Sequence, residues 1–303
     1  MKLNDVKKMV MRVLVPGVSG VSVLLIAGLV CGLTLIFIVN GAPHMSWEFL
    51  TTAPREGMTE GGILPAIIGT FLLVLIMSVA GVPIGTVTAI FMSEYVAQDS
   101  FVVKSIRFAV NTLAGIPSIV FGLFGLGFFV QFVGSGMDSA LGHGIIKWGQ
   151  PNILWASLTM AVLTLPVVIV SVEEAIRTVP RELREASLAL GATRLETIIK
   201  VVLPGCSTGI LTGTILAISR GAGEVAPILF TGAAYFLPHL PSSLSDQFMN
   251  LGYHVYIMST QSSNVDATKG IQYATTLVLL LLTFVFNISA ILLRFHIRKK
   301  SFA

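Results

Sequence analysis

Six long apolar segments dominate this sequence, and they restrict the chain to a fold built from membrane-spanning helices. A helix needs about 20 mainly apolar residues to cross the hydrocarbon core of a bilayer. The segments lie at about 18–39, 63–92, 108–133, 153–172, 205–236 and 272–293. Only 11% of the residues are charged and 54% are hydrophobic, which excludes an ordinary soluble domain. We therefore predict an all-α integral membrane protein with six transmembrane helices.

Lysine and arginine are unevenly divided between the two sides that six spans define. The N-terminus, the loops after the second and fourth segments, and the C-terminus carry fifteen of the 19 basic residues. The opposite loops, 40–62, 134–152 and 237–270, carry only Arg55, Lys147 and Lys269. Because cytoplasmic loops hold the excess of positive charge, both termini are predicted to be cytoplasmic. The first segment has no A-x-A cleavage site after it, and we expect an uncleaved anchor.

Motifs for catalysis or for binding a metal or nucleotide are absent from the sequence. There is no Walker A pattern, no nucleophile elbow and no His/Cys spacing typical of a metal site. Cys31 and Cys206 lie in apolar segments and are interpreted as packing residues, and most of the five histidines are expected at the surface. We predict a protein without catalytic residues, metal or bound cofactor. If transport requires ATP, ATP and Mg must be bound by a partner ATPase.

A stripe of small residues runs along the fifth segment at every fourth position. It consists of Gly205, Gly209, Gly213, Ala217 and Gly221. Small residues at this spacing let two helix backbones approach closely in a membrane. The stripe drifts around the helix by about 40° per step, so the partner surface must wrap around it.

The longest loop on the basic side, "RTVPRELREASLALGATRLETIIKVVLPG", covers 177–205. Pro180 is typical of a helix start and Gly191 of a helix end, and Thr193 with Glu196 forms a capping box that starts a second helix. We therefore predict a short amphipathic helix, a break at Gly191, and a second helix leading to Pro204. Such a helical knob can dock into a groove on a cytoplasmic partner.

The same loop resembles the EAA loop of ABC-importer permeases, which reads E-A-A, three residues, Gly, nine residues, I-x-L-P. The matching positions here are Glu185, Ala186, Ser187, Gly191, Val201, Leu203 and Pro204. Ser187 in place of Ala and Val201 in place of Ile depart from the motif by small volumes. The resemblance implies that these residues couple the chain to an ATP-binding subunit.

Other segments are similar to the PstA family of phosphate ABC-importer permeases. "GVPIGTVTAIFMSEY" (81–95), "NTLAGIPSIVFG" (111–122), "GAGEVAPILFTGAA" (221–234) and "LGYHVYIMSTQ" (251–261) carry the resemblance in order. It implies the type I importer permease fold in a bacterial inner membrane, with a core permease domain at 61–296. Residues 1–60 would add the N-terminus, the first span and an outer loop, and 297–303 a cytoplasmic tail. The implied partners are a PstC-like permease, an ATP-binding subunit dimer and an extracytoplasmic phosphate-binding protein.

Two charged residues, Arg220 and Glu224, lie inside the fifth apolar segment, separated by "GAG". An arginine at the bilayer centre costs about 2.5–3.5 kcal/mol on insertion scales and usually faces a pathway or a partner. The guanidinium fork matches two oxygens of a phosphate, and Ser219 adds a neutral donor. We predict that these three residues line the substrate path, with Glu224 pairing with Arg220 when the anion is absent. The alternative is a purely structural ion pair.

Three other functions are compatible with parts of this sequence. A permease for sulfate, molybdate or another oxyanion would share every feature except the PstA-like sequence motifs. An ion-coupled secondary transporter or anion channel would use Arg220 and Glu224 but would not need the EAA-like loop. A purely structural membrane scaffold would leave Arg220 without a purpose.

Overall fold

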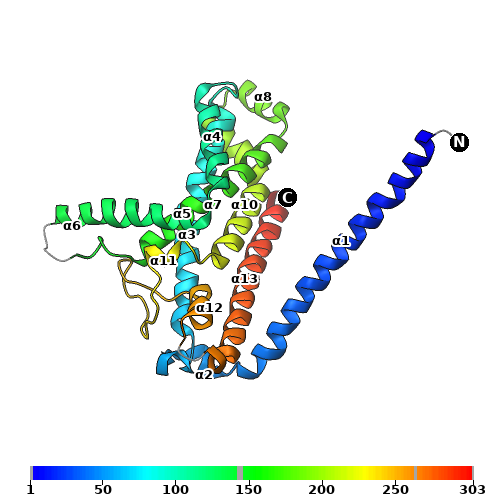
Figure 1. Ribbon diagram of the computed structural model, residues 1–303. Helices are drawn as coiled ribbons and strands as arrows, with labels where there is room; N and C mark the ends of the chain where they lie inside the picture. The colour runs from blue at the N-terminus through cyan, green and yellow to red at the C-terminus, as the bar shows by residue number, and fades with distance from the viewer. Residues whose placement is uncertain (1–2, 142–145, 263–264, 302–303) are drawn as a thin grey trace.

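The computed structural model describes residues 3–141, 146–262 and 265–301, and it is built almost entirely of helices (Figure 1). Within these ranges, six helical stretches are long and apolar enough to cross a membrane, which confirms the predicted number. They are Leu14–His44, Leu64–Tyr95, Ser118–Leu141, Ile153–Thr178, Arg194–Gly223 and Thr268–His296. The third and fifth of these differ most from their predicted ranges.

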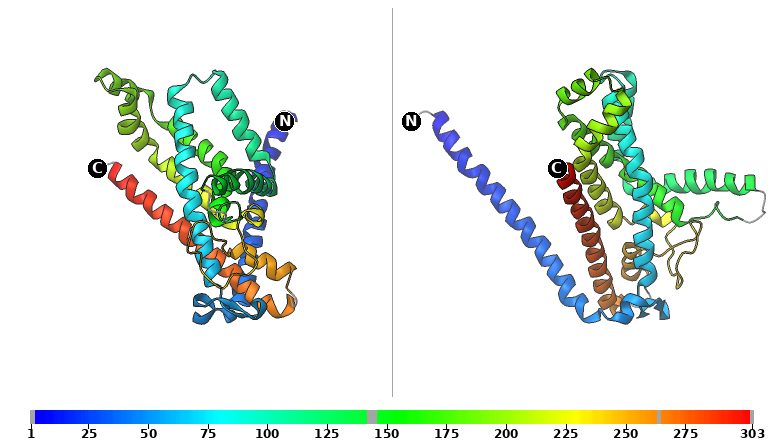
Figure 2. Two further views of the ribbon diagram at one scale, coloured as in Figure 1. Left: turned by 90° about the vertical axis from the view of Figure 1, so that its left-hand side faces the viewer. Right: turned by 180° about the vertical axis from the view of Figure 1, so that it is seen from behind.

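The centre of the molecule is formed by three packed helices, α3 (Leu64–Ile90), α7 (Ile153–Thr178) and α10 (Leu203–Gly223). A fourth, α13 (Val265–Ser301), lies along α10. Buried Leu73, Met77 and Met160 join α3 to α7 in one cluster. Figures 1 and 2 place α8 (Arg181–Ala189) at one end of this bundle, and α2 (Trp47–Thr51) with α12 (Leu251–Thr260) at the other. We call these the α8 end and the α12 end.

The small-residue stripe of α10 packs closely against its neighbours, as predicted. A Cβ at Gly213 would lie 3.0 Å from that of Ser171 on α7, and one at Gly209 would collide with Ala175. At the far end of the stripe the neighbour changes: a Cβ on Gly221 would lie 2.5 Å from the sulfur of Met77 on α3. The stripe therefore follows α7 first and α3 last, which is the wrapping expected from its drift around the helix.

The third apolar segment is not one helix from 108 to 133, so that prediction is wrong. Helix α4 (Phe101–Gly115) ends before Ile116, whose backbone is extended (φ −78°, ψ 133°) because the next residue is Pro117. A new helix then runs through α5 (Ser118–Gly125), the π-helical η4 (Leu126–Gly134) and α6 (Ser135–Leu141). It projects sideways from the bundle (Figures 1 and 2).

The fifth segment also differs from its predicted range of 205–236. It begins earlier, because α9 (Arg194–Thr197) and the π-helical η5 (Ile198–Val202) lead directly into α10. It ends earlier as well, at Gly223, after which the chain turns into the short α11 (Ile228–Thr231). Two glycines in the last turn and a following Pro227 account for this early end.

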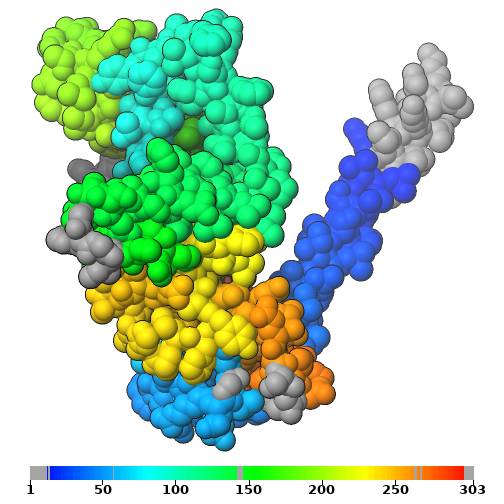
Figure 3. Space-filling model, turned by 60° about the vertical axis from the view of Figure 1, so that its left-hand side comes forward, coloured from blue at the N-terminus to red at the C-terminus, as the bar shows by residue number. Residues whose placement is uncertain are grey.

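Helix α1 (Leu3–Gly41) stands apart from the rest of the chain over most of its length (Figure 3). It meets α13 near its own C-terminal end, where Phe37 and Tyr273 lie 6.2 Å apart between ring centroids and Gly41 approaches the Tyr273 backbone. Nearly all the described side chains from 14 to 40 are exposed. Cys31 is among them, so the interpretation as a packing residue does not hold for it within the described chain, whereas Cys206 is buried as predicted.

The α12 end is closed by short elements. These are η1 (Ala42–His44), α2, η2 (Glu56–Met58) and an antiparallel pair of two-residue strands, β1 (Pro54–Arg55) and β2 (Glu60–Gly61). Phe49, Met249 and Leu251 form a buried cluster there with residues of α3 and α13. His254 on α12 is only 2% exposed, so the expectation of surface histidines does not hold for it.

Candidate functional site

Arg220 occupies the last turn of α10, and the helix ends three residues later at Gly223. Glu224 is the first residue outside the helix and has an extended backbone (φ −79°, ψ 134°). The last carbonyls of a helix have no partners within it, and a cation in this turn is favoured by the helix dipole. The sequence motif therefore forms a helix end inside an apolar segment, with a positive charge held beside it.

The contact between Arg220 and Glu224 is single and long. Arg220 Nε lies 3.4 Å from Glu224 Oε1, and neither of the other two guanidinium nitrogens has a hydrogen-bond partner among the described residues. The Arg220 side chain is 38% exposed and that of Glu224 is 24% exposed. Charged groups inside a membrane span face water, a pathway or protein rather than lipid. The open side of this pair is therefore a surface suited to an anion or to a second polypeptide.

Ser219 has a partner on another helix that the sequence analysis missed. Its hydroxyl contacts the Asn287 side-chain oxygen at 2.7 Å and the Ile215 carbonyl at 2.8 Å. Asn287 lies in the last span, on α13. An asparagine within that apolar stretch was the available signal, because polar side chains inside spans are costly and usually paired. Four polar residues from α10, α13 and the turn after α10 thus gather at this position.

The opposite side of the same turn is tightly packed. Gly221 and Ala222 are buried, and Ala222 belongs to the cluster of Leu73, Met77 and Met160 on α3 and α7. A shift of α3 against α7 would therefore change the packing around Gly221 and Ala222, the two residues that follow Arg220.

The predicted EAA-like loop forms at the far end of α10, about 30 Å away for a 21-residue helix. Helix α8 ends at Ala189, and Gly191, two residues further on, has the left-handed backbone (φ +89°) that glycine tolerates best. The amides of Gly191 and Ala192 bond back to the carbonyls of Leu188 and Ser187. The capping box between Thr193 and Glu196 is present and starts α9. The predicted break and both helices are confirmed.

Most of the EAA-like positions face outward. Glu185, Ala186, Gly191 and Pro204 are exposed, while Ser187, Val201 and Leu203 are partly buried. The Ser187 hydroxyl contacts that of Thr197 at 2.9 Å and so joins α8 to α9. Apolar side chains of α8, of the turn after it and of α9 are exposed to solvent. Leu190 is 90% exposed, and Leu183, Leu188 and Leu195 are also exposed. Exposed apolar patches of this kind mark interaction sites.

Arg184, which the sequence analysis did not single out, holds this loop to the bundle. Its Nε and Nη2 donate to Glu94 Oε1 at 3.1 and 2.9 Å. Its Nη1 donates to the carbonyl of Val179 at 2.7 Å, and its Nη2 to that of Ile176 at 2.9 Å. No local pattern predicts this pair, because 90 residues separate its members. A pair of cations, Arg107 and Arg177, meets Glu173 nearby.

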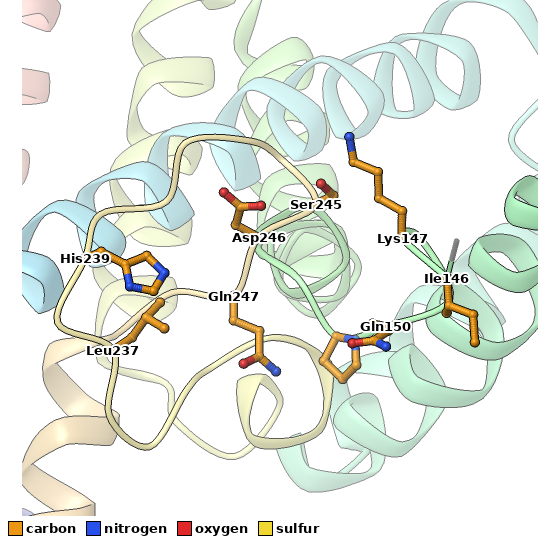
Figure 4. A pocket seen from close by; sticks show the side chains of 9 residues that line it. Ile146, Lys147, Gln150, Leu237, His239, Ser245, Asp246 and Gln247 are labelled. Carbon is orange, nitrogen blue, oxygen red and sulfur yellow. The ribbon is translucent and has the colours of Figure 1, made fainter. Parts of the chain in front are cut away.

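A pocket of about 400 Å³ lies toward the other end of the molecule, between residues 146–151 and 237–247 (Figure 4). Lys147, His239 and Asp246 are among its lining residues. The hydroxyl and the backbone amide of Ser242 hydrogen-bond to Asp246 and hold the pKa of its carboxyl below the usual value. Because both signs of charge are present, the pocket does not single out an anion.

The fold and these sites define a class of protein: a helical membrane protein with a charged helix end within its spans and an exposed, partly apolar helical loop at one end. The chain belongs to the family of binding-protein-dependent transport system inner membrane components, whose model matches residues 81–300. It is therefore a non-catalytic permease subunit of an ABC importer and a multi-pass inner-membrane protein.

Individual relatives are consistent with this family. The chain is 34% identical over 299 residues to the probable ABC transporter permease protein YqgI of Bacillus subtilis (strain 168), covering 95% of this chain and 96% of the relative. It is 31% identical over 234 residues to the phosphate transport system permease protein PstA of Haemophilus influenzae (strain ATCC 51907 / DSM 11121 / KW20 / Rd), covering 77% and 73%. The resemblance to PstA permeases is thereby confirmed.

The fold is found in solved importers as well. A chain in the crystal structure of a bacterial alginate ABC transporter, in complex with an alginate pentasaccharide-bound periplasmic protein, matches with a TM-score of 0.63. The match covers 97% of this chain and 96% of that one at 16% identity. At that identity it supports the fold alone.

Proposed function

We propose that this chain is the permease subunit of an ATP-driven phosphate importer. In this proposal it forms the translocation path with a partner permease of the PstC type. Its EAA-like loop docks on an ATP-binding subunit dimer, which holds ATP and Mg, and its outer loops meet a phosphate-binding protein. Similarity to PstA permeases supports phosphate as the substrate.

The observation that carries the proposal is the incompletely paired Arg220 at the end of α10. Its single 3.4 Å contact leaves most of the guanidinium fork available, and its side chain is accessible from one side. Phosphate oxygens accept two parallel bonds from such a fork. Structural ion pairs in low-dielectric surroundings need additional hydrogen bonds to offset desolvation, and within the described part of the chain this pair has none. The geometry favours a site that a ligand completes.

The neighbouring groups suggest how phosphate is held and released. Glu224 competes with the anion for Arg220, and its negative charge prevents binding that is too tight for conduction. Ser219, placed by Asn287, supplies a hydroxyl within the same turn. The three predicted path residues thus act as donor, competitor and neutral contact.

The two ends of the molecule suit opposite partners. The exposed leucines of α8 and α9 support docking of a cytoplasmic ATPase at the α8 end. The loops at 40–62, 134–152 and 237–270, with the pocket between two of them, would then face the binding protein. This orientation agrees with the excess of lysine and arginine in the loops predicted to be cytoplasmic.

Uptake of radiolabelled phosphate by cells that carry Arg220→Gln, beside a pull-down of the ATPase, tests the proposal. Loss of uptake with wild-type co-purification assigns Arg220 to the path or its gating. Loss of both makes the pair structural and refutes the site. Arg220→Lys is the matched control, because it keeps the charge and loses only the fork.

Two further arms separate the alternatives. Excess sulfate or molybdate that abolishes phosphate uptake, and is itself taken up, would assign the chain to another oxyanion. Uptake that survives removal of the ATPase would favour an ion-coupled transporter and contradict the importer mechanism.

A further inference from the structure

One guanidinium connects three elements at the α8 end. Arg184 projects from α8, bonds to Glu94 in the π-helical turn η3 (Phe91–Tyr95) that ends the second span, and caps the Ile176 and Val179 carbonyls of α7. The Arg184 side chain is 18% exposed and that of Glu94 is 14% exposed. Removal from water strengthens such bonds, so this is a firm connection and not a fluctuating surface pair.

The connection matters most for α3. Helix α7 continues into α8 through Val179 and Pro180, so the chain itself transmits motion between them. Helix α3 has no such covalent link, since its span ends at Tyr95. Within the described ranges, Arg184 is the α8 side chain that hydrogen-bonds to this span. The Glu94 carboxylate is therefore the polar link through which a movement of α8 reaches α3.

From there, tight packing leads to the charged turn of α10. Met77 of α3 lies directly against Gly221, the residue after Arg220, so closely that a Cβ at Gly221 would be 2.5 Å from the Met77 sulfur. Close-packed interiors transmit displacement because they have little free volume to absorb it. A shift of α3 along its length thus displaces the turn that carries Arg220. This turn lies about 30 Å from the EAA-like loop, a distance set by the length of α10.

We propose that the Glu94–Arg184 ion pair is the coupling link that makes α3 move with the docking loop, so that ATP-driven motion opens or closes the Arg220 turn. The inference rests on the proposed function and adds two positioning residues to it. The pair stays formed throughout the cycle, and breaking it separates ATP hydrolysis from transport.

The first test is Glu94→Gln in the whole transporter, reconstituted in vesicles with its ATPase and binding protein. Phosphate uptake per ATP hydrolysed should fall about tenfold or more, since the Arg184 charge loses its partner, while ATPase co-purification stays at the wild-type level. Glu174→Gln is the matched control: the same change on α7, at an exposed residue with no side-chain hydrogen bond or ion pair among the described residues. It should leave the ratio unchanged.

A second test asks whether the link is mechanical. The native cysteines are first removed by Cys31→Ala and Cys206→Ala. Two new cysteines are then introduced by Glu94→Cys and Arg184→Cys, and a short bifunctional reagent joins their thiols. Transport per ATP should be low before the reaction and return to at least half of the cysteine-free value after it. A cross-link that blocks transport would show that the pair must open, and would overturn the proposal.

A third measurement separates this inference from the choice of substrate. Gly223→Cys introduces a thiol at an exposed position with open space around it, at the end of α10. Its rate of labelling by a water-soluble maleimide should change on ATP addition, and Glu94→Gln should abolish that change. An unchanged ATP response in Glu94→Gln contradicts the link. Absence of phosphate uptake in the wild type contradicts the proposed function alone, because labelling does not require phosphate.

Discussion

Two arginine–glutamate pairs lie at opposite ends of the α10 region and differ in almost every physical respect. Arg184 and Glu94 come from elements 90 residues apart, are mostly buried, and share a network that includes two backbone carbonyls. Arg220 and Glu224 are four residues apart, more exposed, and joined by a single 3.4 Å contact. The same two residue types thus form a mostly buried, extensively hydrogen-bonded pair in one place and a more exposed, weakly bonded pair in the other.

The difference lies in how fully each guanidinium is used. All of the Arg184 nitrogens have protein acceptors, so no ligand can enter without breaking bonds that hold three elements together. Arg220 has one weak partner and an accessible side, so a ligand with two oxygens gains bonds there. The number of guanidinium nitrogens with protein acceptors therefore distinguishes the two arginines, and under the proposed function it marks Arg220 as the one that binds the ligand.

The largest expected effect comes from removing the arginine of the buried pair. Arg184→Gln should lower the free energy of unfolding by about 3–5 kcal/mol, because it leaves a buried charge unpaired. Arg220→Gln should lower it by less than about 1 kcal/mol, as for exposed pairs. Thermal denaturation of the purified transporter measures both. Equal losses would remove the distinction between the two pairs.

His254 extends the comparison to a buried titratable group without a partner. Burial lowers its pKa from the ordinary 6.5 to about 4, and its Nδ1 has no hydrogen-bond partner among the described residues. Between these values the unfolded state binds a proton that the folded state does not, so stability falls as pH drops from 6.5 to 4. The loss should reach about 2 kcal/mol at pH 5. Melting curves from pH 7 to 5 should lose this dependence in His254→Leu but keep it in His239→Gln.

Removing the competitor carboxylate sharpens the functional side of the comparison. Glu224→Gln should lower both the KM for phosphate and the maximum uptake rate by about tenfold, the equivalent of roughly 1.4 kcal/mol of tighter binding. Initial rates of uptake over a range of phosphate concentrations provide the measurement. A raised KM would mean that Glu224 holds Arg220 in place instead of competing with phosphate.

The smallest effect concerns the break in the docking loop. Gly191→Ala should cost about 1 kcal/mol, because alanine is disfavoured at φ +89° even though its methyl group meets open space. Gly28→Ala, on the exposed part of α1, is the control and should be neutral or slightly stabilising. ATPase pull-down alongside the melting curves shows whether the strained loop also docks less well.

Local signals predicted much of this molecule. Hydropathy gave the number of spans, and the glycine, proline and capping-box pattern gave the docking loop, since these depend on residues close in sequence. The helix break at Pro117 was visible in the motif "GIPS" but was outweighed by the apolar run around it. Gly221 and Gly223 likewise indicated that α10 ends at Gly223.

Long-range pairs could not be predicted in this way. Glu94 and Arg184, or Ser219 and Asn287, meet only because α3, α7, α10 and α13 pack together, and no periodicity in one segment reveals its partner. The burial of His254 depends in the same way on the packing of α12 against α13 and α3. Sequence reasoning therefore located the open charge pair and missed the fixed one.

The attachment of α1 has a consequence for how the chain is assembled. Its contact surface at Phe37 and Gly41 fits the backbone and ring of Tyr273, near the start of the last span. Because α1 precedes α13 in the chain, it gains this neighbour only when α13 has been made. Until then it has to persist in the bilayer as an isolated span, and a chain cut before α13 would leave it unattached.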